Sequence, residues 1–191
     1  PSPSMSEMQL TEPWSTERFL RWQEGEDALH EFVGGFPLKM PEGVSRRQDR
    51  LVVELIGWLG PALRGTPFAP FTRRFGMETR PGQIRRPAMG VDTVATSPEA
   101  MVATATVAVF EFLCDPRFDF DRLRKIEDYK QAPFLRHIVC LCEDRPLAFH
   151  AFRLTGAGWD GTRIEGLDAS IPLAALGTNL PLREIYNGVS A

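Results

Sequence analysis

A glutamate inside an apolar run carries the strongest chemical implication in this sequence. Glu111 lies within Val-Ala-Val-Phe-Glu-Phe-Leu at residues 107–113, a pattern typical of a strand that is covered on both faces. A carboxylate in that position loses its water, and an unpaired buried charge is strongly destabilising. Glu111 therefore needs a cation, a metal ion or a proton beside it. The alternative is a glutamate at an exposed sheet edge or in an ordinary salt bridge.

Lys125 is the candidate for that cation. It follows Glu111 by fourteen residues, within a segment that we expect to be helical over residues 119–132. Lys125 lies one position before Ile126 and four before Tyr129, at the border of the face that the helix buries. Its ammonium can therefore point at a carboxylate on the strand. The alternative is an exposed lysine on the solvent side of the helix.

Other candidate residues carry weaker signals. Asp92 stands near the end of a predicted strand and is a third acidic candidate, although strand ends and turns commonly carry aspartate. The three histidines, His30, His137 and His150, show no metal-ligand spacing. The sequence contains no P-loop, no dinucleotide-binding glycine motif, no nucleophile elbow and no pair of zinc-type Cys-x-x-Cys motifs.

The positive charge of the chain is concentrated in one segment. Between residues 46 and 86 there are nine arginines against three acidic residues, a net charge of +6, whereas the whole chain has −3. Such asymmetry favours a polyanionic partner, and DNA is the one we expect. The candidate contacts are Arg73, Arg74, Arg85 and Arg86. The alternative is a set of solvated arginines on separate faces.

Length and composition indicate a single globular domain. The chain has 191 residues, of which 43% are hydrophobic and 25% charged. No apolar run approaches the ~20 residues that cross a bilayer, so we expect no membrane partner. Residues 1–4 precede Met5 and are expected to be a cloning remnant, which starts the domain at residue 5. Three cysteines, an odd number, argue against a disulfide framework and favour a cytoplasmic location.

Hydrophobic periodicity and turn residues predict a mixed α/β domain with one central sheet. The Gly34-Gly35 pair predicts a tight hairpin. Such a hairpin, or a sheet edge, is the surface through which we would expect a homodimer to form. Helices are expected over residues 15–22, 45–63, 119–132 and 182–186, and strands over residues 28–33, 36–40, 68–75, 84–94, 105–113, 137–142, 147–154 and 163–171.

The segment from Glu111 to Lys130 resembles the E-V-L-S-P-S-T…D…K…Y stretch of the Uma-two family of restriction-endonuclease-like proteins, within the PD-(D/E)xK nuclease superfamily. The resemblance extends to residues 14–35, 84–92, 165–170, 176–177 and 182–188, in the same order and at similar spacing. It implies a restriction-endonuclease-like mixed central sheet flanked by helices.

The resemblance also implies a chemistry, the metal-assisted hydrolysis of phosphodiester bonds. Glu111 matches the glutamate that holds Mg²⁺, and Mn²⁺ would be an alternative ion. Lys125 matches a catalytic lysine displaced onto the following helix, and Glu31 matches the glutamate of the first hairpin. Carboxylate oxygens suit Mg²⁺, which activates water and polarises the phosphate.

The sequence departs from the family pattern at three places. Ala88 stands where the family has a metal-binding aspartate, Gly34-Gly35-Phe36 replaces Asp-Gly-Glu, and Gln48 replaces a histidine. Asp92 is the substitute ligand that the strand offers, four residues beyond Ala88. Four strand residues span about 13 Å, which is too far for Asp92 to replace the missing carboxylate unless the strand bends. The sequence thus leaves two hypotheses, a DNA endonuclease with an incomplete metal site and an inactive relative that binds nucleic acid or protein.

Overall fold

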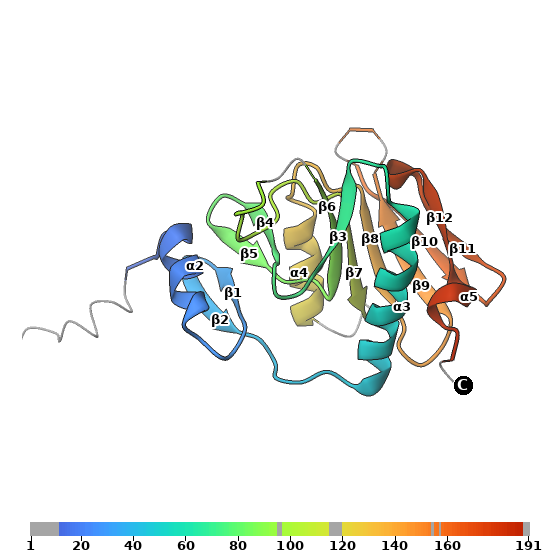
Figure 1. The fold of residues 1–191 in the computed structure, drawn as a ribbon, viewed down its shortest axis with the longest axis horizontal. Coiled ribbons are helices and arrows are strands. Elements are labelled where there is room, and N and C mark those ends of the chain that lie inside the picture. Colours follow the sequence, from blue (N-terminus) through green and yellow to red (C-terminus); the bar gives the residue numbers. More distant parts are fainter. Residues whose placement is uncertain (1–11, 95–96, 115–119, 154, 157, 189–191) are drawn as a thin grey trace, which may run out of the picture.

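A six-stranded mixed sheet forms the centre of the protein (Figure 1). The computed structural model describes residues 12–94, 97–114, 120–153, 155–156 and 158–188. In spatial order the strands are β10 (Asp160–Glu165), β9 (Leu147–Phe152), β8 (His137–Leu141), β7 (Ala108–Phe112), β6 (Met89–Thr93) and β3 (Phe68–Thr72). Among these pairs, β7 and β8 alone run parallel. Parallel neighbours need a crossover connection, and α4 (Phe120–Tyr129) lies within it.

Two helices cover opposite faces of this sheet. Leu51 and Leu55 of α3 (Arg46–Ala62) belong to one apolar cluster with Phe110, whereas Tyr129 of α4 belongs to another with Val109. Successive side chains of a strand point to opposite faces, so β7 contributes to both clusters. This explains why its sequence is almost continuously apolar, as predicted. Glu111 is on the same face as Val109, the face that α4 covers.

A smaller four-stranded sheet lies beside the central one, in the order β2-β1-β5-β4. It consists of β1 (His30–Val33), β2 (Phe36–Lys39), β4 (Met77–Arg80) and β5 (Gln83–Arg85). The β1–β2 hairpin turns at Gly34-Gly35, where positive φ values of 63° and 85° favour glycine. Helix α2 (Thr16–Glu24) packs on β1 through Phe19 and Phe32, whose rings stack at 4.8 Å. Figure 1 shows this unit to one side of the central sheet, joined to α3 by a long connection.

Both long N-terminal helices begin as the sequence predicts. Ser15 caps α2 by accepting a hydrogen bond from the Arg18 N–H, and Ser45 caps α3 in the same way from Gln48. The chain closes with the hairpin β11 (Ser170–Leu173) and β12 (Thr178–Pro181), the 3-10 turn η2 (Ala174–Leu176) and the short helix α5 (Leu182–Ile185).

Several sequence predictions need correction. The strand expected over residues 84–94 is two strands in different sheets, because the chain bends at Arg86-Pro87, and the one expected over 163–171 divides at Gly166, where φ is 98°. Strands β4 and β12 were not predicted. Cys114 and Cys142 form a disulfide, against the expectation from an odd cysteine count, and Cys140 is the free, buried thiol.

Some expectations fall outside the described residues, namely the remnant at residues 1–4, the helix start at Asp119 and the strand end at Leu154. In the part of the chain that the structure describes, no helix is both long and apolar enough to cross a bilayer.

Candidate active site

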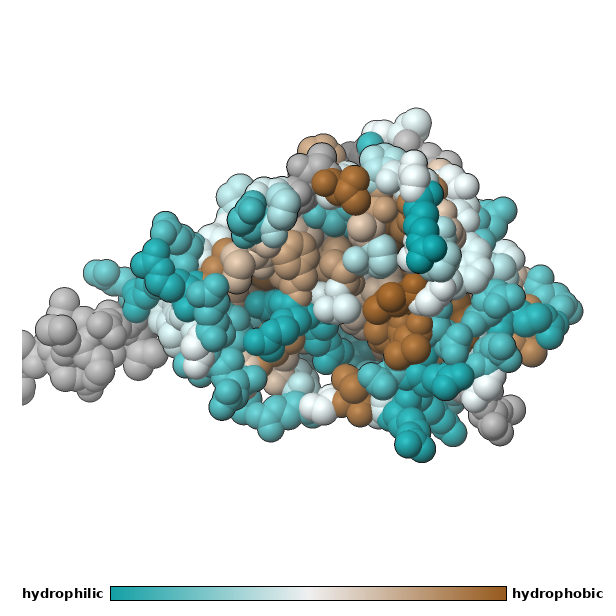
Figure 2. Space-filling model, viewed as in Figure 1, coloured by the Kyte–Doolittle hydropathy of each residue, from teal (hydrophilic) through white to brown (hydrophobic). Residues whose placement is uncertain are grey.

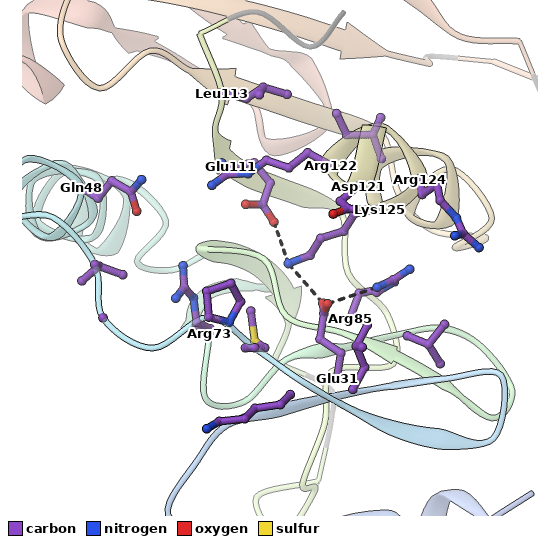
Figure 3. A pocket seen from close by; sticks show the side chains of 18 of the residues that line it. Glu31, Gln48, Arg73, Arg85, Glu111, Leu113, Asp121, Arg122, Arg124 and Lys125 are labelled. Carbon is purple, nitrogen blue, oxygen red and sulfur yellow. Dashed lines mark hydrogen bonds and ion pairs between the residues drawn. The ribbon is translucent and has the colours of Figure 1, made fainter. Parts of the chain in front are cut away.

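Lys125 links two buried carboxylates that come from different sheets. Its Nζ lies 3.4 Å from Oε1 of Glu111, on β7, and 3.1 Å from Oε2 of Glu31, on β1 (Figure 3). It also donates a 2.8 Å hydrogen bond to the Arg86 carbonyl. The predicted ion pair between Glu111 and Lys125 is therefore confirmed, and Glu31 joins it. The three residues that the sequence proposed for catalysis meet at one point.

Glu31 is bound on both of its oxygens. Arg85 donates to Oε1 at 3.1 Å, and the Arg86 backbone N–H donates to Oε2 at 2.7 Å. Arg85 also pairs with Asp128 of α4 at 2.6 Å. Burial by itself lowers the pKa of Arg85, but the charges and hydrogen bonds of Glu31 and Asp128 outweigh burial and raise that pKa. The guanidinium thus stays charged and fastens α4 to the smaller sheet.

Glu111 is held by a second group besides Lys125. The Tyr129 hydroxyl donates a 2.5 Å hydrogen bond to the same oxygen, Oε1. Burial, reinforced by the negative charges of Glu111 and Glu31, raises the pKa of Tyr129 well above its ordinary value. Burial and Glu111 likewise raise the pKa of Cys140, its neighbour on β8, to about 12. Both groups remain protonated at neutral pH, so neither is an anionic nucleophile.

Glu31, Glu111 and Lys125 line a pocket of about 740 Å³. Its walls come from the β1–β2 hairpin, the connection to α3, the start of α3, the end of β7 and α4. Cationic side chains contribute to several walls, namely Lys39, Arg73, Arg85, Arg122, Arg124 and Lys125, against the acidic Glu31, Glu111 and Asp121. The pocket is therefore suited to an anionic ligand.

The four arginines predicted to contact nucleic acid separate into two pairs. Arg73 lines the pocket and Arg74 is exposed, as a surface contact requires. Arg85 and Arg86 are buried instead. The Arg86 guanidinium donates to the backbone carbonyls of His30, Arg73 and Arg74, and burial lowers its pKa to about 10. Arg86 joins segments of the fold together, so the prediction that it contacts DNA from the surface needs correction.

Asp92 is not brought to this pocket. It lies on β6, where its carboxylate accepts a 3.1 Å hydrogen bond from the Ala105 N–H. Met89 on β6 faces Phe110 on β7 in an antiparallel register, so Asp92 and Glu111 lie toward opposite ends of the strand pair. Continuing that register by one residue brings Ala88, just before β6, opposite Glu111. Ala88 itself is buried, and its methyl group packs in the apolar cluster that includes Leu51 and Leu55 of α3.

The donor set fits a Mg²⁺ ion in part. Glu111 and Glu31 provide hard oxygen ligands, which Mg²⁺ prefers, but Ala88 provides none. Among the described residues, one group of three metal-ligand side chains has its ligand atoms within 4.8 Å of one another, namely Cys114, Cys142 and Asp144. None of the three lines this pocket, and the two sulfurs are bonded together.

The sequence interpretation missed Asp128, and it assigned Tyr129 to the core without a polar role. Asp128 and Tyr129 follow Lys125 by three and four residues, spacings that place both beside Lys125 on one side of a helix. This pattern combines a lysine, an aspartate and a tyrosine on a helix face that packs on a buried glutamate. It could have identified the polar roles of Asp128 and Tyr129.

The chain has a mixed α/β fold in which helices flank a mixed central sheet, as the sequence predicts. It is similar to the crystal structure described as "a putative nuclease belonging to DUF820 from Anabaena variabilis ATCC 29413", with a TM-score of 0.68 and 13% sequence identity. The match covers 93% of this chain and 100% of that one. At this identity the likeness concerns the fold alone. No protein-family model matches the chain, and no curated protein does.

Proposed function

We propose that this protein hydrolyses phosphodiester bonds in DNA, with Mg²⁺ or Mn²⁺, at the pocket that contains Glu111, Glu31 and Lys125. The observation that carries the proposal is the meeting of one ammonium and two buried carboxylates at the base of a cation-lined pocket. The similar structure described as a nuclease supports it.

Each residue has a part that its contacts support. Lys125 would offer its ammonium to the charge that develops on the phosphate oxygens during attack. Tyr129 holds Glu111 in one orientation, and Arg85 does the same for Glu31. Glu111 and Glu31 would hold the metal ion, which when bound lowers the pKa of water and polarises the phosphate.

The central test is cleavage of supercoiled plasmid and of a single-stranded DNA circle with Mg²⁺ or Mn²⁺. We expect Glu111→Gln to reduce the rate by at least ~100-fold, because it removes the charge of a metal ligand without changing its shape. Glu127→Gln is the matched control, since Glu127 is an exposed residue of α4 that pairs with Lys130 of the same helix. Absence of cleavage of both DNA forms by the wild-type protein, with either ion, would refute the proposal.

Ala88→Asp tests the incomplete metal site directly. A carboxylate at this position would supply the missing ligand beside Glu111, so we expect faster cleavage and a lower half-saturating Mg²⁺ concentration. Asp at a buried position is destabilising without a metal, and thermal unfolding with and without Mg²⁺ should show that the ion restores stability.

A second candidate function is DNA binding without hydrolysis. Two observations favour it. Residue 88 is an alanine, which cannot bind a metal ion, and the ammonium of Lys125 already compensates the charges of Glu31 and Glu111. This candidate predicts that affinity for DNA falls steeply with salt, that Arg73→Ala weakens binding, and that no divalent ion produces cleavage.

A further inference from the structure

The groups that would react with a phosphate lie deep in the pocket. The side chains of Glu31 and Glu111 are 7% and 10% exposed, and that of Lys125 is 15% exposed. A substrate must therefore enter the pocket to reach them, because they cannot meet a phosphate on a convex surface outside it.

The pocket is enclosed from several directions. The β1–β2 hairpin and the connection over residues 40–45 form one side, and the start of α3, at Ser45 and Gln48, continues from it. Helix α4 forms the opposite side, with Arg122, Arg124 and Lys125. Figure 3 shows Gln48 and Arg73 across the pocket from Arg124.

Its size suits a short piece of a single strand. The volume of about 740 Å³ falls in the range of pockets for single small ligands, roughly 300–1,000 Å³. A B-form duplex, whose major groove alone is about 12 Å wide, cannot be accommodated in such a space. One or two nucleotides can.

The lining matches the chemistry of an unpaired strand. Arg73 and Arg124, on opposite walls, can contact phosphates. Leu38 and Val44, on the hairpin and the connection, line the pocket yet are each 50% exposed, so the fold does not need them as core. Hydrophobic patches are visible over α3 and beside its lower end, where this connection arrives (Figure 2). Unpaired bases offer apolar faces to such side chains, whereas in a duplex these faces are stacked away.

We propose that this pocket binds single-stranded DNA, with the phosphates against Arg73 and Arg124 and a base against Leu38 and Val44, in preference to duplex DNA. The proposal rests on the proposed function in one respect, that the ligand is DNA. It goes further in naming the form of DNA and the residues that select it.

The first experiment compares affinities by fluorescence anisotropy. A labelled single-stranded oligonucleotide and the blunt duplex of the same sequence are titrated with the full chain, at one salt concentration and without divalent ions, so that no cleavage intervenes. We expect the single strand to bind at least ~10-fold more tightly. Equal or tighter binding of the duplex would overturn the proposal, as would binding of neither form.

The second experiment tests the apolar residues. Leu38→Ser together with Val44→Ser should weaken single-strand binding by about 5–10-fold and leave duplex binding unchanged. Val53→Ser is the matched control, because Val53 is 56% exposed on α3 and does not line the pocket. All three side chains are half exposed, so the variants should fold normally. Unchanged single-strand affinity in the double variant would refute the assignment of Leu38 and Val44.

Cleavage assays on supercoiled plasmid and on a single-stranded DNA circle separate this proposal from the proposed function. A preference for single strands without any cleavage would support the binding proposal and refute hydrolysis. Cleavage of duplex DNA without that preference would do the reverse.

Discussion

The Tyr129 hydroxyl donates its hydrogen bond to Oε1 of Glu111, joining the last residue of α4 to the middle of β7. Hydrogen bonds to a charged acceptor contribute about 1.5–3 kcal/mol, compared with about 1 kcal/mol for neutral pairs. We therefore expect Tyr129→Phe to lower the free energy of unfolding by about 2 kcal/mol, measured by urea denaturation at pH 7.5.

Tyr186→Phe is the matched control for Tyr129. The Tyr186 hydroxyl is also buried, but its acceptors are the neutral carbonyls of Cys142 and Leu147. Its loss should cost about 1 kcal/mol. If Tyr186→Phe costs as much as Tyr129→Phe, the charge of Glu111 has no part in the interaction.

Lys125 should contribute to stability as well as to the proposed chemistry. Lys125→Met removes the cation shared by Glu31 and Glu111 and leaves two buried carboxylates with reduced compensation. Removing one partner of a buried ion pair typically lowers the free energy of unfolding by about 3–5 kcal/mol. Because both glutamates keep other contacts, we expect a loss at the lower end, ~3 kcal/mol. Urea denaturation at pH 7.5 would measure the loss.

Two further variants test the cause of that loss. Lys130→Met removes a lysine of the same helix whose partner, Glu127, is exposed, and should cost less than ~0.5 kcal/mol. Lys125→Met combined with Glu111→Gln should regain part of the stability, since one uncompensated charge is removed. If the double variant is less stable than Lys125→Met, charge compensation is not the reason.

The meeting of Glu111 and Lys125 was predictable because each residue conflicts with its local pattern. A carboxylate in an apolar strand and a lysine at the border of a buried helix face each need a partner, and the crossover connection brings the helix back over the strand. The hairpin at Gly34-Gly35 and the serine caps of two helices were predictable for a similar reason, since each depends on neighbours in sequence.

The inward direction of Arg85 and Arg86 was not predictable. Charge counting shows that arginines gather between residues 46 and 86, but not which way each side chain points. That direction depends on partners distant in sequence, because Arg85 meets Glu31 across 54 residues and Asp128 across 43. The predicted strand also divides after Arg85, so that β5 and β6 belong to different sheets.

The buried pair His137 and His150 should make stability sensitive to acid. His137 Nε2 accepts the Ala175 N–H, so its proton is on Nδ1, which lies 3.0 Å from His150 Nε2. Burial lowers the pKa of each imidazole from 6.5 to about 4, and the second imidazole adds to the effect at His137.

Between pH 6.5 and about 4 the unfolded chain therefore binds more protons than the folded one, and stability falls as the pH drops. The shift corresponds to about 3 kcal/mol for protonation of one imidazole. Urea denaturation at pH 7.5 and pH 5 should show the decrease. His150→Phe removes one titrating group, so the decrease in the free energy of unfolding between pH 7.5 and pH 5 should be smaller in this variant. An unchanged decrease would mean that other groups cause the acid sensitivity.

The close approach of Phe71 to Gly90 gives the last prediction. These residues face each other across β3 and β6, and a Cβ on Gly90 would lie 2.2 Å from Cζ of the Phe71 ring and within 2.9 Å of two further ring atoms. The ring is buried and packs in the α4 cluster, so it cannot simply turn away. Gly90→Ala should therefore destabilise the protein by about 1–3 kcal/mol.

Gly57→Ala is the matched control, and its effect should have the opposite sign. Gly57 lies inside α3, where a Cβ would meet no atom within 4 Å. Alanine lowers the entropy of the unfolded chain, so the helix should gain about 0.5–1 kcal/mol. Thermal unfolding of both variants would decide the matter. If Gly90→Ala also stabilises the protein, the sheet accommodates a side chain at position 90. The Phe71 ring is then not the reason for a glycine at that position.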